Sequence, residues 1–339
     1  MTSIVNFPSR RTPSLRTLTT LLWGLALTCW FPAGLEAQLD IVITKLKSSE
    51  GTFKRKGAIV EWKGLSLTLN SNGREIEIDN PDVVEVQTNW NSDYVDGLKE
   101  IKAGNTQVAI VKFEEALLNE KRPWAQRIIR AQLVDAFMLV EKPNSAIQQF
   151  LRITAEDPQT RFVHLTPLPW INSRHNLEAP ALELIKSPDL LTQLIGASWL
   201  TSGKHKAQSL QVLQELANDI DPSIAALATA QLWRVRTGVV AKQADVWQGI
   251  LNRMPRDVRA GPCLVLANAQ SQAGQTDQAI INLMRIPTLH PDRNSISAAA
   301  LYRMASLLHN KGQSDNARSI LQELVTYYPQ SIWAQQASK

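Results

Sequence analysis

The side chains that most often carry acid–base or metal chemistry are few and widely spaced in this chain. Among its 339 residues are two cysteines and five histidines: His164, His175, His205, His290 and His309. None of them stands in a His-Glu-x-x-His, Cys-x-x-Cys or nucleophile-elbow pattern, whose spacing brings two reactive groups to one helix face or one sharp turn. The sequence therefore predicts no metal, no cofactor and no catalytic centre, and we expect a protein that is not an enzyme.

One segment of the sequence leaves the alternative of an enzyme open. His164 and His175 lie in a proline-rich segment, residues 159–180, that has no helical period. Long irregular segments inside compact domains are often functional. If both histidines met several carboxylates between an N-terminal β-region and the helices, acid–base chemistry would be possible there. Trp170 offers two other interpretations of the segment, a loop pinned by one ring or an arm that contacts a partner.

The first 37 residues have the pattern of a secretory signal peptide. Three arginines precede an apolar stretch of 14 residues, Leu18–Phe31, and Ala37 offers a small residue before Gln38. Such a stretch is too short to span a membrane, which takes about 20 residues. We expect export, a periplasmic or cell-envelope location, and no transmembrane segment after cleavage. Cys263 is then the single cysteine, and its place in an apolar helix predicts a buried thiol without a disulfide partner.

Charge argues against a nucleic-acid partner. The whole chain has 36 basic and 31 acidic residues, a net charge of +5. Removal of the three arginines and one glutamate of the signal peptide leaves 33 basic and 30 acidic side chains. A nucleic-acid-binding protein would concentrate a larger positive charge on one surface.

Residues 38–90 predict a small β-domain. Leu65–Leu69 and Glu75–Asp79 alternate apolar and polar side chains, and Asn72-Gly73 between them is typical of a tight hairpin turn. Further strands are expected over residues 41–44, 58–62 and 83–87. Five short strands in about fifty residues resemble the SH3-like or Sm-like barrels, so the expected architecture is a small, partly open barrel.

The rest of the chain repeats a spacing of 37 or 38 residues. Each unit has small residues where two helices cross, a glycine where the first helix ends, and a proline after the second helix. The glycines are Gly104, Gly274 and Gly312; the prolines are Pro158, Pro291 and Pro329; the small residues include Gly97, Ala109, Ala267, Ala279, Ala305 and Ala317. A fixed period of this size indicates stacked helical hairpins.

These units resemble the tetratricopeptide repeat (TPR), most clearly over residues 94–158 and 262–335. The ending Tyr327–Ser331, followed by Trp333, is similar to repeats of periplasmic proteins of outer-membrane assembly and cell division. The expected fold class is mainly α, a TPR-like α-helical solenoid preceded by a small all-β barrel-like domain. The expected segments are the signal peptide 1–37, β-domain 38–90, repeats 91–158, proline-rich loop 159–180, degenerate helical repeats 181–256 and C-terminal repeats 257–339. Residues 181–256 either continue the solenoid or form a separate bundle.

The TPR resemblance implies a concave groove lined by the first helix of each repeat. Its groove positions fall on Leu264, Asn268, Ser271, Gln272, Tyr302, Arg303, Ser306, His309 and Asn310. In the first repeats these positions are mostly apolar, so a later helix or the barrel should cover them. Tyr94 and Leu98 replace the lysine and asparagine with which some TPR proteins hold a free C-terminus, so an extended peptide is the expected ligand.

The resulting functional hypothesis is an exported, non-catalytic adaptor or scaffold that binds a protein or an extended peptide in this groove. An alternative is a structural envelope component that self-associates through Trp333 and Tyr328 on an exposed terminal repeat. The sequence does not choose the partner or the oligomeric state.

Overall fold

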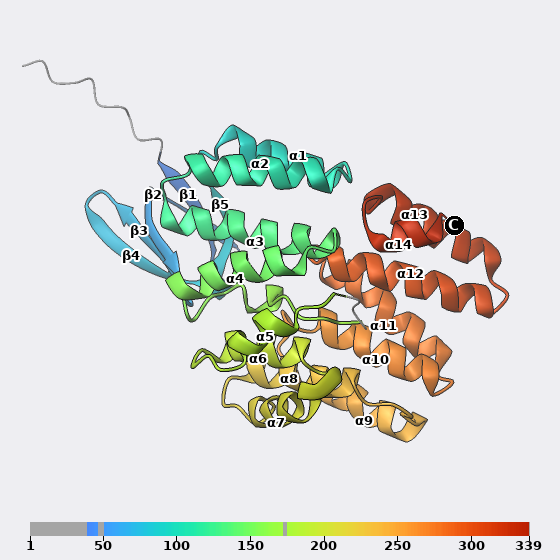
Figure 1. Ribbon diagram of the computed structural model, residues 1–339. Coiled ribbons are helices and arrows are strands. Elements are labelled where there is room, and N and C mark those ends of the chain that lie inside the picture. Colours follow the sequence, from blue (N-terminus) through green and yellow to red (C-terminus); the bar gives the residue numbers. More distant parts are fainter. Residues whose placement is uncertain (1–38, 47–50, 172–174, 339) are drawn as a thin grey trace, which may run out of the picture. The chain divides into compact units, whose positions relative to one another are not determined.

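A computed structural model describes residues 39–46, 51–171 and 175–338. The expected order of a small β-region followed by helical hairpins is confirmed (Figure 1). The expected signal peptide, residues 1–37, lies outside the described residues. Everything below concerns the compact unit that begins at Leu39.

The β-region is one antiparallel sheet in the order β4-β3-β2-β1-β5. Its strands are β1 (Asp40–Lys45), β2 (Thr52–Lys63), β3 (Ser66–Ser71), β4 (Arg74–Asp79) and β5 (Val83–Gln87). No ladder joins β4 to β5 among the described strands, so the sheet is open. The expected hairpin turn is confirmed, because Asn72 and Gly73 both have positive φ, 54° and 79°.

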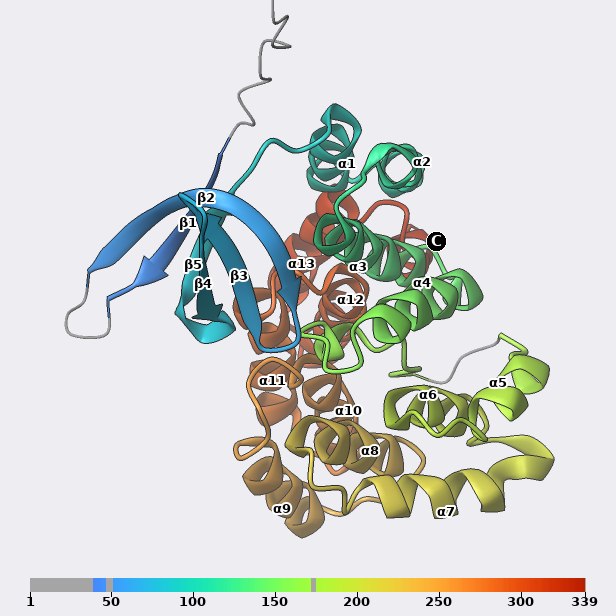
Figure 2. The same ribbon diagram turned by 90° about the vertical axis from the view of Figure 1, so that its left-hand side faces the viewer.

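The sheet curves through its longest strand. β2 has 12 residues, whereas only 58–62 were expected; its first half pairs with β1 and its second half with β3. Gly57 lies where the partner changes, and a Cβ there would stand 2.3 Å from the carbonyl oxygen of Asn70. Only glycine permits so close an approach of two backbones. Figure 2 shows the curved β2 beside α3 (Pro123–Leu139), with which it is in contact.

Arginines and aromatic rings join the sheet to the helices. Arg127 of α3 is buried, forms an ion pair with Glu61, and donates to the carbonyl oxygen of Trp62 at 2.9 Å. The guanidinium of Arg161 lies 3.5 Å from the centre of the Trp62 ring. A cation on a ring face gains stability when both are withdrawn from water. The β-region is therefore fixed to the first helical repeats.

The repeat hairpins at the two ends of the helical region have the expected turns. They are formed by α1 (Ser92–Lys102) with α2 (Thr106–Asn119), α3 with α4 (Pro143–Glu156), α10 (Ala260–Gln272) with α11 (Thr276–Leu289), and α12 (Asn294–Asn310) with α13 (Ser314–Tyr327). Gly104, Gly274 and Gly312 each have a φ of 78–79°, the left-handed conformation that ends the first helix. In the α3–α4 hairpin Glu141 takes this place with a φ of 59°.

The middle helices are attached to the C-terminal repeats. They are α5 (Glu178–Leu184), α6 (Leu190–Trp199), α7 (Lys206–Leu216), α8 (Pro222–Arg234) and α9 (Ala241–Leu251). Both α8 and α9 pack on α10. The stretch from α5 to α13 is therefore one run of neighbouring helices, which α14 (Ile332–Ala337) closes against α12 and α13.

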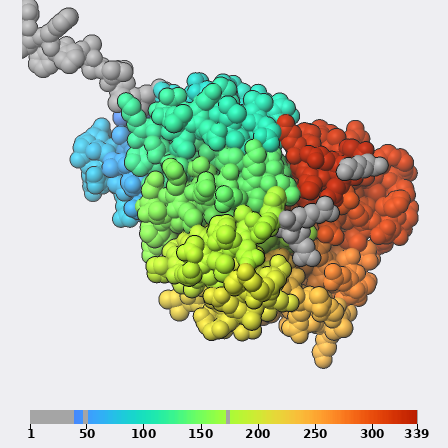
Figure 3. All heavy atoms as spheres, viewed as in Figure 1, coloured from blue at the N-terminus to red at the C-terminus, as the bar shows by residue number. Residues whose placement is uncertain are grey.

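The first repeats also pack against the last ones. α3 contacts α12, although about 160 residues separate them along the chain (Figure 1). Pro329 lies against Gly104, where a Cβ would be 2.7 Å from the proline Cδ, and Gln330 accepts a hydrogen bond from the backbone of Gln107 at 2.7 Å. Figure 3 shows the surfaces of α1–α2 and the C-terminal helices in contact. Asp135 of α3, which the TPR resemblance places at a groove position of the first repeats, is covered by α12, as expected of a later helix.

Asp135 makes the polar part of this junction. Its buried carboxylate accepts hydrogen bonds from the backbone N–H of Asn294 at 3.0 Å and of Ser295 at 3.3 Å, and from both side chains at 2.8–2.9 Å. These are the first two residues of α12, whose N–H groups have no partner within the helix. A side chain of α3 therefore caps α12 and neutralises the positive end of its dipole.

We expect Asp135→Ala to lower the free energy of unfolding by about 2–3 kcal/mol, because it leaves buried donors at the start of α12 without their charged acceptor. Urea denaturation measures this. Asp221→Ala is the matched control, since Asp221 caps α8, the helix that directly follows it in the chain. Loss of this local cap should lower the free energy of unfolding by about 1 kcal/mol. If Asp135→Ala lowered the free energy of unfolding no more than Asp221→Ala does, the α3–α12 junction would contribute no more to stability than a local helix cap.

Candidate functional site

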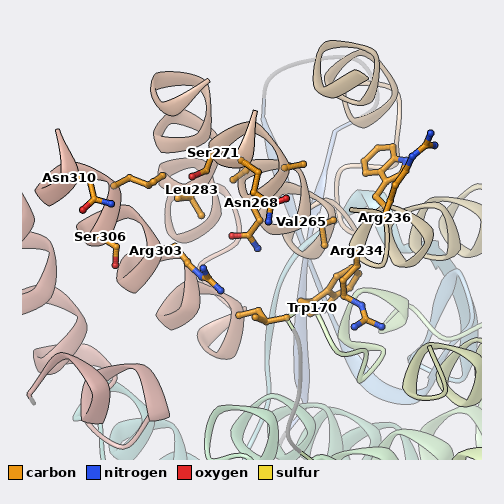
Figure 4. A pocket seen from close by; sticks show the side chains of 16 residues that line it. Trp170, Arg234, Arg236, Val265, Asn268, Ser271, Leu283, Arg303, Ser306 and Asn310 are labelled. Atoms are coloured by element: carbon orange, nitrogen blue, oxygen red, sulfur yellow. The ribbon is translucent and has the colours of Figure 1, made fainter. Parts of the chain in front are cut away.

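The concave side of the C-terminal repeats holds two adjoining cavities. The first, of about 340 Å³, lies between α8, α10 and α12; we call it the arginine cavity because Arg234, Arg236 and Arg303 line it (Figure 4). The second, of about 310 Å³, lies between α12, α14 and the end of α3; we call it the tryptophan cavity because Trp170, Trp199 and Trp333 line it. Trp170, Ile171 and Arg303 line both cavities, which makes them one groove.

Six of the nine residues expected to face a groove do line the arginine cavity: Asn268, Ser271, Gln272, Arg303, Ser306 and Asn310. They come from α10 and α12, which place side chains four residues apart on one face. Asn268, Ser271 and Arg303 are half-buried, whereas Gln272, Ser306 and Asn310 are exposed.

The other three residues expected in the groove do not line the arginine cavity. Leu264 is buried and forms part of the wall of the tryptophan cavity. Tyr302 is half-buried because its ring packs on that of Trp333, with 5.3 Å between the ring centres. His309 is exposed and lines neither cavity. For Tyr302 the reason is α14, which packs against α12 and places Trp333 on the tyrosine ring.

Residues from outside the regular repeats complete the groove. Trp233 and Arg234 end α8 and Arg236 follows it, while Trp170 and Ile171 belong to residues 157–171, which we call the crossover segment. The side chains of α8 were not expected in the groove, since residues 181–256 have no clear register, whereas Trp170 was expected either as a ring that pins its loop or as part of an arm that contacts a partner. The available signal was Trp170 itself, a large aromatic side chain among prolines.

The crossover segment is fixed in place by its own side chains. Leu168 is buried, and the indole of Trp199 donates to the carbonyl oxygen of Pro167 at 3.0 Å. Trp170 is 8% exposed and lies over Gly261, where a Cβ would be 2.2 Å from the indole ring. Trp170 therefore packs the crossover segment onto α10, and its ring forms part of the groove wall.

Burial of charge distinguishes the arginine cavity. Arg234 donates to three neutral oxygens: the side chain of Gln231 at 2.8 Å, the carbonyl of Ser198 at 2.9 Å and the hydroxyl of Thr201 at 2.7 Å. Burial lowers the pKa of Arg234 to about 10, because desolvation disfavours its charged form. The guanidinium is still charged at neutral pH and is held rigidly.

The groups that could do other chemistry are dispersed. His164 lies 3.3 Å from Asp292, whose pKa is lowered to about 2 chiefly by the hydrogen bond from that histidine. His175 instead lies 3.1 Å from Glu141, at the tryptophan cavity. The two histidines therefore have different carboxylate partners rather than sharing one site. The described residues contain no cluster of three or more histidine, cysteine or acidic side chains that could hold a metal ion.

Cys263 is buried, as expected. Desolvation raises the pKa of its thiol to about 11, so almost none of it is the reactive thiolate at neutral pH. Within α10, the Cys263 side chain is packed in the protein core.

Comparison with known proteins identifies one repeat. A family model for the tetratricopeptide repeat matches residues 299–331, which span most of α12, all of α13 and the end at Ser331. This stretch contains Arg303, Ser306 and Asn310 of the arginine cavity. No curated protein matches the chain. Helical repeats of this kind form extended concave binding surfaces, so the match indicates a protein-interaction scaffold. No helix in the described ranges is long and apolar enough to cross a membrane.

We expect Gly261→Ala to lower the free energy of unfolding by about 1–3 kcal/mol, because the new methyl group collides with Trp170. Gly249→Ala in α9 is the control; nothing lies within 4 Å of its Cβ position, and alanine should stabilise that helix by about 0.5–1 kcal/mol. In a Trp170→Leu background the cost of Gly261→Ala should fall, as a double-mutant cycle would show. An unchanged cost would contradict the assigned contact.

We expect the native protein to react with iodoacetamide at pH 8 at least about 100-fold more slowly than the unfolded chain, since burial both raises the thiol pKa and blocks access. The measurement uses a Cys29→Ser variant, so that Cys263 is the only thiol. Comparable rates in buffer and in urea would show that Cys263 is accessible.

Proposed function

We propose that this protein is an exported adaptor of the cell envelope that holds an extended segment of a protein partner in the groove formed by the arginine and tryptophan cavities. The proposal is supported by the repeat match at residues 299–331 and by the groove on the concave side of that repeat. Export is inferred from the pattern of residues 1–37.

The observation that carries the proposal is a set of unused polar side chains beside an apolar cavity. Asn268, Gln272 and Asn310 line the arginine cavity and make no side-chain hydrogen bond to another described residue; Asn268 is half-buried, and the other two are exposed. Side-chain amides supply both donors and acceptors, which the backbone of an extended peptide can use. The adjoining tryptophan cavity offers space and aromatic surface for an apolar side chain of the same peptide.

Self-association through the terminal repeat has less support. Trp333 and Tyr328 were expected on an exposed end, but both are half-buried. Trp333 packs on Tyr302, and α14 packs against α12 and α13. They do not provide the exposed aromatic patch that this alternative needs.

We expect a photo-crosslinking amino acid at Ser306 or Gln336 to give the same single adduct in the producing cell, because Ser306 lines the arginine cavity and Gln336 lines the tryptophan cavity. Gln322, exposed on α13 and outside both cavities, is the matched control position. Mass spectrometry identifies the linked segment. Adducts at Gln322 equal to those in the groove, or an adduct with a second copy of this chain, would contradict the proposal.

A further inference from the structure

One edge of the β-sheet is regular and has no partner strand. β4 pairs with β3 along its whole length, and no described strand pairs with its other side. The opposite edge, β5, is less regular, because its ladder to β1 shifts register between Ile43 and Thr44. Figure 1 shows the β3–β4 hairpin with its turn pointing away from the helices. β4 therefore presents a straight run of backbone to which another strand could be added.

The free backbone groups of β4 belong to its acidic residues. The residues beside a two-residue hairpin turn bond to each other, and so does every second pair along the ladder. The even-numbered residues of β4 therefore bond to β3, and the N–H of Asn80 continues the pattern by donating to the carbonyl oxygen of Leu65 at 2.7 Å. The N–H and C=O groups of Glu75, Glu77 and Asp79 point away from β3 instead, and all three residues are exposed.

The same three residues give the edge a uniform negative charge. Side chains alternate between the two faces of a strand, so the three carboxylates lie on one face and the two isoleucines of β4 on the other. No ion pair joins these carboxylates to a basic side chain among the described residues. Glu77 accepts a hydrogen bond from the hydroxyl of Ser66 at 2.7 Å, which leaves its charge uncompensated.

The isoleucine face of the edge adjoins a cavity of about 220 Å³. Ile78 lines this cavity together with Phe53 and Thr44 from the paired ends of β2 and β1, while Leu46 and charged side chains complete the lining. Ile78 is buried, but Phe53 is 49% exposed. An apolar side chain on an added strand would lie beside Ile78 and withdraw part of the Phe53 ring from water.

The charge of the edge decides which strand can pair with it. A free edge is a template for other strands, and charged side chains on it protect against self-pairing. If two copies of β4 paired in antiparallel fashion, carboxylates would face carboxylates, and like charges directly opposite each other destabilise a sheet. Lysine or arginine at alternate positions of another chain would instead form opposite-charge pairs across the new ladder. The occupant that fits is therefore a basic strand and not a second copy of this chain.

We propose that the free edge of β4 binds an extended segment of a protein partner in which basic residues alternate with apolar ones, as an additional antiparallel strand. Hydrogen bonds to the backbone of Glu75 and Glu77 supply affinity, and the alternating side chains supply specificity. The basic residues face the three carboxylates, and the apolar residues face Ile78 and Phe53. This edge shares no residue with the arginine and tryptophan cavities, so it is an interaction site separate from the groove.

The test uses the purified mature chain and a synthetic peptide, Thr-Lys-Val-Lys-Val-Lys-Thr, with both ends blocked. Its Kd, measured by calorimetry at low salt, should be at least about tenfold lower than that of the same peptide with glutamate in place of lysine, because three opposite-charge pairs are replaced by like-charge pairs. Free Glu75 and Glu77 amides should exchange with solvent rapidly, and the lysine peptide should slow their exchange, as NMR of protein labelled at glutamate nitrogen would show.

Backbone methylation of the peptide separates strand addition from simple charge attraction. In the antiparallel arrangement the lysine opposite Glu77 directs its N–H toward β4, whereas each valine directs its N–H away. Methylation of the central lysine nitrogen should raise the Kd by about tenfold or more, since it removes a hydrogen bond and crowds the edge. Methylation of one valine nitrogen is the matched control, with the same composition and charge, and should leave the Kd within about threefold.

Charge reversal on the protein tests the assigned residues. Glu75→Lys combined with Glu77→Lys should invert the preference, so that the glutamate peptide binds more tightly than the lysine peptide. The matched control combines Glu114→Lys with Glu323→Lys, which are exposed on α2 and α13 and change the net charge by the same amount. The control should keep the wild-type preference. Circular dichroism checks that both variants are folded.

The proposal would be overturned by any of four results: no binding of the lysine peptide, equal Kd values for the two methylated peptides, an unchanged preference after reversal of the edge charges, or a dimer of the free protein in which the Glu75 and Glu77 amides are already protected. The last result would identify a second copy as the occupant. Crosslinking at Ser306 and Gln336 tests the groove independently, because neither residue belongs to this edge.

Discussion

The buried carboxylate of Asp135 joins two parts of the chain that the repeat pattern alone would leave apart. By accepting the first N–H groups of α12, it fixes the end of that helix against α3. A charged acceptor at a helix N-terminus is stabilised by the unpaired N–H groups and by the helix dipole together. The contact of Pro329 with Gly104 extends the same junction to the first hairpin. The first and last repeats therefore form one packed body.

Part of the groove lies beside this junction, because Met138 of α3 and Ser295 of α12 both line the tryptophan cavity. After α4 the chain continues as the crossover segment, whose Trp170 and Ile171 line the groove, and α5–α9 then lead to α10. Trp170 lies on α10 over Gly261, and only a residue without Cβ leaves room for its ring. The indole therefore divides the concave side into a polar cavity and an aromatic one. A regular solenoid of the same helices would have no such wall.

Local features of this fold could be predicted from the sequence because they depend on neighbouring residues. The turn at Asn72-Gly73 and the helix ends at Gly104, Gly274 and Gly312 follow from positive φ values that glycine adopts easily. The turn at Glu141 has the same geometry without glycine, so composition could not reveal it.

The candidate site could be predicted only in part, because only some of its residues are placed by local helical spacing. Side chains of α10 and α12 follow the helical spacing, so Asn268, Ser271 and Arg303 were found. Tyr302 fits the spacing equally well, but α14 covers it, and that contact is not local. Arg234 enters the cavity from a helix whose sequence has lost the repeat register. Long-range packing, rather than residue type, decided which of these side chains face the groove.

The half-buried and buried arginines of this chain differ in what offsets their desolvation. Arg161 is also largely buried, and burial lowers its pKa to about 10, yet its guanidinium stacks on Trp62 and lies in the field of Asp157. Such contacts offset desolvation, and they hold the β-region to the helices. Arg303 has no comparable contact among the described residues, although it lies on a helix fixed at both ends. A missing acceptor does not by itself mark a binding group: Arg293 is buried at the α3–α12 junction and its Nε also has no acceptor, while the charges of Asp135 and Asp292 lie near it. What separates Arg303 from Arg293 is its place at two open cavities.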